Sequence, residues 1–291
     1  MKGVIHLNKW EQLYTNHGNL LYKKSNNDEN LKFAWSCYEE YRLEIDELEI
    51  VNQENIRKLV QATNIYREKV INIFEKRKNS GQEGFRSTIL EEFFCHLFKD
   101  LIKSSIKDSP AIYFGKGNSY VSLGFSPKTL GDLFENPKPY IHTKDQDFII
   151  GCAIDVEITL KDNNQCNTKE STVIPVLAIE CKTYIERNML DSCAATATRL
   201  KNAMPYCMYI LASEYMKMDD AFPELTDIDE VFILCKASNS EREQLRKEDK
   251  PPHLLDEDLV VELFEMVKKH FNKRWWNPED ALRSGRVINR P

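Results

Sequence analysis

The stretch Val173-Ile174-Pro175-Val176-Leu177-Ala178-Ile179 ends abruptly at Glu180-Cys181-Lys182. A run this apolar, led in by β-branched residues, is typical of a strand that is buried on both faces of a sheet. An unpaired charge would be very costly there, so the two charged residues need a partner or a function. Side chains two apart on a strand point to the same side, so Glu180 and Lys182 emerge together at the strand's end. This spacing suits a metal site with a lysine beside it.

Such a site needs a second acidic ligand, and the segment from Lys144 to Gly151 offers one at the head of another short strand. Asp147 is the first choice because Phe148–Ile150 follows it directly as predicted strand. Asp145 lies one pleat earlier on the same side and is the reserve candidate. Asp155, in the next predicted strand, is the third.

The surrounding segments predict an α/β fold. An amphipathic helix over Thr88–Lys103 precedes the acidic segments, because its apolar residues recur at helical spacing. Residues 153–160 alternate as a strand, and the polar stretch 161–171 is expected to turn it back into the apolar run, giving an antiparallel meander. A helix over Met189–Asn202 then leads into a strand over Tyr206–Leu211, which makes a right-handed crossover.

In this order of elements, Asp147 and Glu180-Cys181-Lys182 resemble the signature of the PD-(D/E)XK nuclease superfamily. The resemblance implies a restriction-endonuclease-like core, a central mixed sheet flanked by helices in the order αβββαβ. More narrowly, residues 178–190 are similar to the active-site strand of type II restriction endonucleases that cut as two related subunits, the BbvCI-like enzymes. The likeness covers residues 85 to 215 and has no support in the first 80.

The resemblance implies hydrolysis of phosphodiester bonds in double-stranded DNA with Mg²⁺ as cofactor. Asp147, Glu180 and the backbone carbonyl of Cys181 would hold the ion, since magnesium prefers oxygen ligands. Lys182 would orient the attacking water, lower its pKa or stabilise the developing negative charge. The catalytic residues implied are therefore Asp147, Glu180 and Lys182.

A further carboxylate from the upstream helix is common in this superfamily. By helical phase Glu91 lies on the flank of the apolar stripe, whereas Glu92 points away from it, so Glu91 is the candidate auxiliary metal ligand. Each assignment has a structural alternative. Glu91 could be a solvated helix residue, and Asp147 could be a turn residue that opens a strand. Glu180 and Lys182 could form a surface ion pair at a strand end.

The leading hypothesis is a site-specific, magnesium-dependent endonuclease of restriction type, acting as a homodimer or as a heterodimer with a related subunit. The same hypothesis expects a cognate DNA methyltransferase in the system. One alternative is a PD-(D/E)XK nuclease of repair, recombination or defence. Another, from a different class, is a non-catalytic DNA-binding protein that keeps the fold and uses Glu180 and Lys182 as structural ions.

Composition is that of an ordinary soluble protein: 291 residues, 42% hydrophobic and 30% charged. No stretch is long enough for a membrane span and no signal peptide is evident, so a cytoplasmic location without membrane partners is expected. The eight cysteines form no Cys-x-x-Cys pair, which argues against a zinc site or a disulfide framework. A net charge of −6 argues against indiscriminate coating of nucleic acid.

Two regions are predicted along the chain. Residues 1–80 are expected to be helical, with helices over Asn30–Glu47 and Asn52–Lys78, and to help recognise DNA or pack against a second subunit. The polar, glycine-containing stretch that follows Lys76 marks a boundary, so that residues 85–291 form the nuclease domain. This domain is expected to close with a strand over Glu230–Lys236 and a helix over Asp256–Asn272.

DNA contacts are predicted from position alone. Residues 113–127 contain Gly115-Lys116-Gly117, which is expected to turn a hairpin. This hairpin either brings Lys116 and Asn118 to a DNA groove or is a plain surface turn. The C-terminal tail, residues 268–290, interleaves basic residues with Trp275 and Trp276 and is suited to contact phosphates and bases. The alternative is a solvated helix end whose tryptophans pack on the core. Further candidate phosphate contacts are Lys144, Arg187, Arg199, Lys201 and Arg274.

Overall fold

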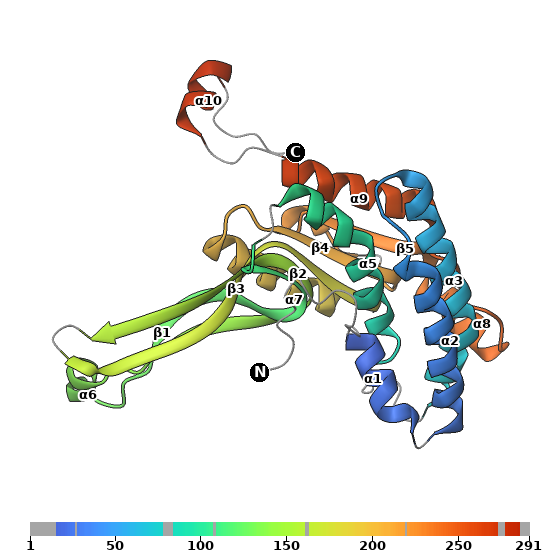
Figure 1. The fold of residues 1–291 in the computed structure, drawn as a ribbon, viewed down its shortest axis with the longest axis horizontal. Helices are drawn as coiled ribbons and strands as arrows, with labels where there is room; N and C mark the ends of the chain where they lie inside the picture. Colours follow the sequence, from blue (N-terminus) through green and yellow to red (C-terminus); the bar gives the residue numbers. More distant parts are fainter. Residues whose placement is uncertain are drawn as a thin grey trace.

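The computed structural model describes residues 16–26, 28–77, 84–106, 109–160, 163–218, 220–272 and 277–285. In these residues a five-stranded mixed sheet forms the centre, with helices on both of its faces (Figure 1). No helix in this part of the chain is long and apolar enough to cross a membrane. The elements are α1 (Asn16–Ser25), α2 (Glu29–Asp46), α3 (Gln53–Glu75), α5 (Ser87–Ser105), β1 (Ile112–Phe125), α6 (Leu130–Glu135), β2 (Pro139–Leu160), β3 (Asn163–Ile185), α7 (Arg187–Ala203), β4 (Met208–Met216), η2 (Pro223–Leu225), β5 (Glu230–Ser238), α8 (Asn239–Lys247), α9 (Glu257–Asn272) and α10 (Pro278–Ser284).

The strands lie in the order β1-β2-β3-β4-β5. The first three form an antiparallel meander, and β3, β4 and β5 run parallel. Helix α7 connects β3 to β4 as the predicted crossover. The succession α5, β1, β2, β3, α7, β4 therefore confirms the expected αβββαβ core.

The apolar run at the centre of β3 is buried on both faces, as its composition predicts. Leu177 and Ile179 belong to the larger hydrophobic cluster, which α3, α5 and α9 share. Ala178 points the other way, into a smaller cluster with Leu190 and Leu200 of α7. Buried thiols also occupy core positions, at Cys37, Cys181, Cys193, Cys207 and Cys235.

Two strand predictions are wrong in detail. The segments 148–150 and 153–160 belong to one long strand, β2, so that the first strand of the meander is β1. The polar stretch expected to be a turn is mostly strand, because β3 already begins at Asn163 and pairs Ser171 with Asp155 of β2. Here the strands leave the body as an arm (Figure 1), where two-sided exposure permits polar side chains.

The hairpin expected at Gly115-Lys116-Gly117 is also wrong, because β1 continues through it. The three residues form a bulge, where the register with β2 shifts between Gly115 and Gly117. Gly115 has a φ of 109°, which favours glycine. A Cβ on Gly117 would collide with the phenol ring of Tyr113, so a larger residue there would displace that side chain. The bulge re-aims Lys116, as bulges near functional sites often do.

The two long N-terminal helices predicted from the sequence are confirmed as α2 and α3. Their buried residues, among them Tyr38, Leu59 and Val70, belong to the same hydrophobic cluster as α5 and β3. Part of the predicted boundary, residues 78–83, lies outside the described residues, and the division of the chain near residue 80 stays a prediction.

A buried histidine joins α1 to the helices beneath it. The Nδ1 atom of His17 lies 2.7 Å from Thr88 Oγ1 on α5, and its Nε2 lies 2.7 Å from the Tyr66 hydroxyl on α3. Burial, only partly opposed by the charge of Glu92, lowers the pKa of His17 to about 4. The His17 imidazole is therefore neutral in the folded protein at neutral pH.

This gives a pH-dependent stability. The pKa of His17 in the folded protein lies below its ordinary 6.5. The contribution of His17 to the free energy of unfolding is therefore complete above pH 6.5 and falls by up to about 3 kcal/mol as the pH drops toward 4. We expect His17→Gln to be less stable than the wild type at pH 7, with a difference that shrinks toward pH 4.5 in urea unfolding. Other groups change the free energy of unfolding with pH in the opposite direction, such as Glu91, whose pKa is raised. They act equally in the wild type and the variant, so they cancel in the difference. A difference independent of pH would contradict this account.

Candidate active site

Strands β2 and β3 bring the predicted acids and lysine together. The antiparallel register pairs Phe148 with Ile179, which sets Asp147 of β2 beside Glu180 of β3. The Nζ atom of Lys182 lies 2.5 Å from Glu180 Oε1 and 3.6 Å from Asp147 Oδ2. The two carboxylate side chains are each 19% exposed and that of Lys182 is 28% exposed, so the cluster is open to solvent.

The backbone of β3 orients the Asp147 carboxylate. Its Oδ2 atom accepts a hydrogen bond from the backbone N–H of Cys181 at 3.0 Å. The Cys181 thiol itself is buried in the core, so this residue offers only its backbone to the acids. A charge-assisted bond from a sheet amide holds the carboxylate more firmly than a side-chain partner on a mobile loop would.

Glu91 extends the cluster from helix α5. Its side chain points inward and the residue is only 3% exposed, so the alternative of a solvated helix residue is wrong. The Nδ2 atom of Asn16, on α1, donates to Glu91 Oε2 at 2.7 Å. Lys116 Nζ, from the β1 bulge, bridges Glu91 Oε1 at 3.4 Å and Asp147 Oδ1 at 3.3 Å.

Sequence reasoning did not foresee this bridging position of Lys116. It placed Lys116 at a hairpin tip for contact with DNA, whereas the bulge turns the side chain toward the acids. It did not foresee Asn16 at all, since one asparagine in a polar segment carries no signal. For Lys116 the signal was available in the flanking glycines, which are typical of a bulge as well as of a turn.

The electrostatics reflect three carboxylates held close together. Burial, followed by the charge of Asp147, raises the pKa of Glu180. Burial also raises the pKa of Glu91 to about 7, with Lys116 opposing and Asp147 adding to the shift. Burial acts to lower the pKa of Lys182, but Glu180 and Asp147 outweigh it and the pKa is raised. Lys182 is therefore an ammonium at neutral pH.

The expectation that Glu92 points away from the apolar face of its helix is wrong, because Glu92 is fully buried. It lies under α2, where Arg42 Nη1 approaches at 3.5 Å and the Tyr38 hydroxyl donates at 3.3 Å. His96 Nε2 is 2.9 Å from its Oε1. Its hydrogen bond to His96 and the nearby cations hold the pKa of Glu92 below its usual value against the effect of burial. Glu92 thus has structural partners and faces α2 instead of the cluster.

The two reserve acids lie less favourably. Asp145 is exposed on β2 opposite Asn118, and its charge acts on Lys116. Asp155 lies on the same strand as Asp147, not on the next one, and is part of the exposed arm. There it accepts from Ser171 Oγ at 2.6 Å and pairs with Lys169 at 3.3 Å. Of the three aspartates, Asp147 is the one in contact with Lys182.

The predicted DNA contacts divide into two groups. Two lie on the strands of the site: Lys144 of β2, whose charge acts on the pKa of Glu180, and Asn118 of β1, which is exposed opposite Asp145. The others are on or next to α7. Arg199 is exposed, Arg187 donates to Asp220 at 2.8 Å and Lys201 pairs with Asp229 at 2.8 Å. Arg274 and both tryptophans of the tail lie outside the described residues.

The oxygen donors fit a small hard cation. Three carboxylates converge, and like charge contributes to the raised pKa values of two of them, a repulsion that a divalent cation would relieve. In the part of the chain that the structure describes, no group of three or more His, Cys, Asp or Glu has metal-ligand geometry. Lys116 contacts Glu91 and Asp147, and Lys182 contacts Asp147 and Glu180, so both ammonium groups would have to shift for a cation to bind.

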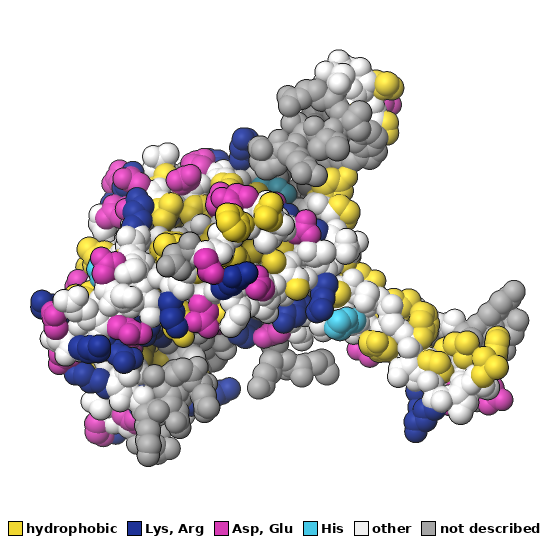
Figure 2. All heavy atoms as spheres, turned by 180° about the vertical axis from the view of Figure 1, so that it is seen from behind, with side chains coloured by type: hydrophobic (Ala, Val, Ile, Leu, Met, Phe, Trp, Pro, Cys, Tyr) yellow, Lys and Arg dark blue, Asp and Glu magenta, His cyan; other side chains and the backbone are white. Residues whose placement is uncertain are grey.

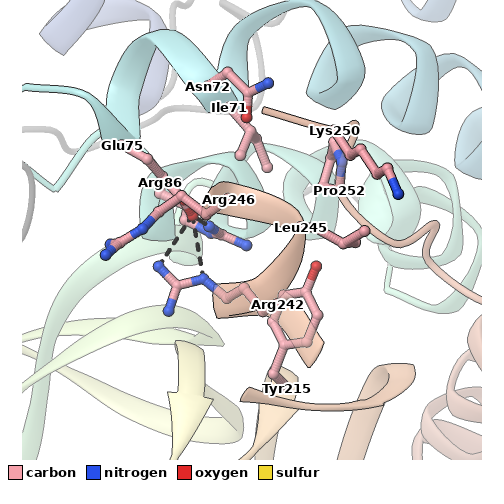
Figure 3. A pocket seen from close by; sticks show the side chains of 10 residues that line it. All are labelled: Ile71, Asn72, Glu75, Arg86, Tyr215, Arg242, Leu245, Arg246, Lys250 and Pro252. Carbon is pink, nitrogen blue, oxygen red and sulfur yellow. Dashed lines mark hydrogen bonds and ion pairs between the residues drawn. The ribbon is translucent and has the colours of Figure 1, made fainter. Parts of the chain in front are cut away.

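A pocket lies elsewhere, between α3, α8 and the end of β4 (Figure 3). Four basic residues line it, and Arg242 donates to Glu75 at 3.1 and 3.0 Å. None of the predicted site residues lines this pocket, so it is separate from the acidic cluster. The basic residues are Arg86, Arg242, Arg246 and Lys250.

Comparisons with known proteins bear on the family and the fold. Residues 82–286 match the Bpu10I restriction endonuclease family. A chain of native BbvCI, solved as an A2B2 tetramer at low resolution, is similar in fold, with a TM-score of 0.68 and 19% sequence identity over 87% of this chain and 93% of that chain. No curated protein matches. The family match spans more than half of the chain, so the chain belongs to the Bpu10I restriction endonuclease family.

Proposed function

We propose that this chain is a type II restriction endonuclease, or one subunit of it, that hydrolyses DNA phosphodiester bonds at a specific sequence with Mg²⁺. The observation that carries the proposal is the convergence of Asp147, Glu180 and Lys182 at the sheet, within a chain of a restriction endonuclease family. Paired carboxylates next to a lysine suit cleavage of a phosphodiester, because the substrate is an anion and its transition state gains negative charge.

Asp147, Glu180 and the carbonyl of Cys181 would hold the cation, with Glu91 as an auxiliary ligand. Magnesium bound there would supply a Lewis acid for the scissile phosphate. The peptide N–H of Cys181 keeps Asp147 aimed at the site, and Asn16 does the same for Glu91. Both acids are therefore oriented before substrate arrives, and the groups that move when a cation binds are the ammonium groups of Lys116 and Lys182.

Lys182 acts in this proposal as a positive hydrogen-bond donor. Its raised pKa keeps the side chain protonated at neutral pH, so it does not serve as the base that removes a proton from water. Its ammonium is suited to orient the attacking water and to stabilise negative charge on the phosphate. Lys116, Lys144 and Asn118, on the strands that carry the acids, are proposed to contact the DNA backbone.

Cleavage of both strands needs a second active site, because one site of this kind cuts one strand. BbvCI was solved as an A2B2 tetramer. We infer that this chain likewise acts with a second subunit, either a copy of itself or a related chain. A restriction enzyme also requires protection of the host DNA, so a cognate DNA methyltransferase is expected.

The first test is cleavage of a long DNA of known sequence by the purified protein. We expect discrete fragments with Mg²⁺ and none after chelation by EDTA, since the carboxylates need a cation to face a phosphate. Nicked DNA would indicate a missing second subunit, and a smear would indicate a nonspecific nuclease. DNA that stays intact under all conditions while being bound would contradict the catalytic proposal.

A substitution ties that cleavage to the acidic cluster. We expect Glu180→Gln to lower the rate by a factor of about 10³, because the variant loses a charged cation ligand. Glu157→Gln is the matched control, since Glu157 is exposed on the same sheet away from the acids. Calorimetric titration of each protein with Mg²⁺ should show weaker binding only for Glu180→Gln. Equal activity of the two variants would count against the proposed site.

A further inference from the structure

An arm of β-strands projects from the body and ends in the short helix α6 (Figure 1). Residues 123–141, called the tip from here on, comprise the end of β1, α6 and the start of β2. Strand pairing keeps the tip together, with Leu123 opposite Ile141 and Phe125 opposite Pro139. None of the α6 residues Leu130–Glu135, all of which are described, is buried.

The tip exposes an unusual amount of apolar surface. Phe134 is 72% exposed and Leu130 is 75% exposed, and hydrophobic side chains gather along the arm and at its end (Figure 2). Six large apolar side chains of the tip are each between 41% and 75% exposed. At about 200 Å² for a fully exposed side chain, together they expose on the order of 600 Å². That is at the upper end of what a monomer exposes in one patch, about 300–600 Å². The exposed large apolar residues of the tip are Leu123, Phe125, Leu130, Leu133, Phe134 and Tyr140.

The charges of the tip point to a protein partner in preference to nucleic acid. Its ionisable side chains are Lys128, Asp132, Glu135 and Lys138, so its net charge is zero. A surface that grips the phosphate backbone needs an excess of lysine and arginine. Two positive and two negative groups around an apolar centre can instead pair with the same surface on a second copy related by a two-fold axis.

We propose that the tip is a self-association surface, through which two copies of this chain form a dimer. Its apolar area approaches the ~800 Å² that each partner contributes to a standard interface. Phe125, Leu130 and Phe134 would lie at the centre, and the two lysines would pair across the axis with Asp132 and Glu135. This interface rests on the proposed function, in which cleavage of both DNA strands needs two active sites, and it identifies the surface that would join the two copies.

The test is the oligomeric state of the full chain, measured by sedimentation without DNA or metal. We expect the wild type to be a dimer at about 50 µM. Leu130→Asp/Phe134→Asp should raise the dimer dissociation constant at least ~10-fold, because both substitutions bury charge at the interface. The matched control is Phe222→Asp/Leu225→Asp, which alters side chains 70% and 85% exposed on the body, and it should stay dimeric.

Unchanged circular dichroism and melting would show that the tip variant is folded, as expected for solvent-exposed positions. A wild type that stays monomeric at this concentration overturns the proposal, as does association that appears only with a related subunit. Equal dissociation constants for the two double variants also overturn it. So does a tip variant that dimerises normally but loses DNA binding. Because the assay contains neither DNA nor Mg²⁺, failure of the cleavage proposal leaves its result unaffected.

Discussion

Lys182→Ala should lower the DNA cleavage rate by a factor of about 10³ while the protein still folds and binds DNA. The Lys182 ammonium contacts both Glu180 and Asp147, and their charges keep it protonated. Removing it deletes the group proposed to orient water and to stabilise charge in the transition state. The measurement is single-turnover cleavage of a cognate DNA at saturating Mg²⁺, which separates chemistry from product release.

Substrate binding should respond differently from cleavage. A positive charge is lost next to two carboxylates, so binding of Mg²⁺ should be unchanged or tighter and DNA affinity nearly unchanged. Lys69→Ala is the matched control, since Lys69 also pairs with a carboxylate, Glu40, at 2.8 Å and is partly exposed, but lies on α3. Cleavage by Lys182→Ala at the rate of this control would show that the cluster is not catalytic.

Glu214→Gln should cost about 3–5 kcal/mol of folding free energy, the largest stability effect that we expect from a single side chain. Glu214 of β4 is fully buried, and its Oε2 atom accepts from Arg67 at 2.7 Å and from Arg86 at 2.9 Å. Burial acts to raise the pKa of Glu214, but the two arginines outweigh it and lower the pKa to about 2. The amide would leave both guanidinium groups of this network without their shared buried anion.

The measurement is urea unfolding at pH 7, with Asp249→Asn as the control. Asp249 pairs with Lys76 at 2.8 Å, but both side chains are more than half exposed, so its loss should change stability by less than about 1 kcal/mol. The network joins α3, the start of α5 and β4, so its failure should destabilise the whole fold. A loss below 1 kcal/mol for Glu214→Gln would mean that the two arginines find other partners.

Local sequence was sufficient to predict the strand and the acids of the proposed site. The apolar run of β3 predicted burial on both faces, and its abrupt end at Glu180 and Lys182 predicted a cluster of charge, because burying an unpaired ion is costly. Period-two geometry then set both side chains on one side of the strand. The helices α2, α3, α5, α7 and α9 were predictable for a similar reason, since apolar spacing is a property of neighbouring residues.

Tertiary structure alone decided what surrounds those acids. Asn16 meets Glu91 across 75 residues of chain and Lys116 meets Asp147 across 31. The glycines that flank Lys116 permit a bulge, but no local pattern encodes the partner of either side chain. The same holds for β2, whose two predicted pieces form one strand because β1 and β3 pair along its length. Sequence periodicity reports which face of an element is apolar, whereas the neighbours of a polar side chain depend on which distant segments the packed core brings to it.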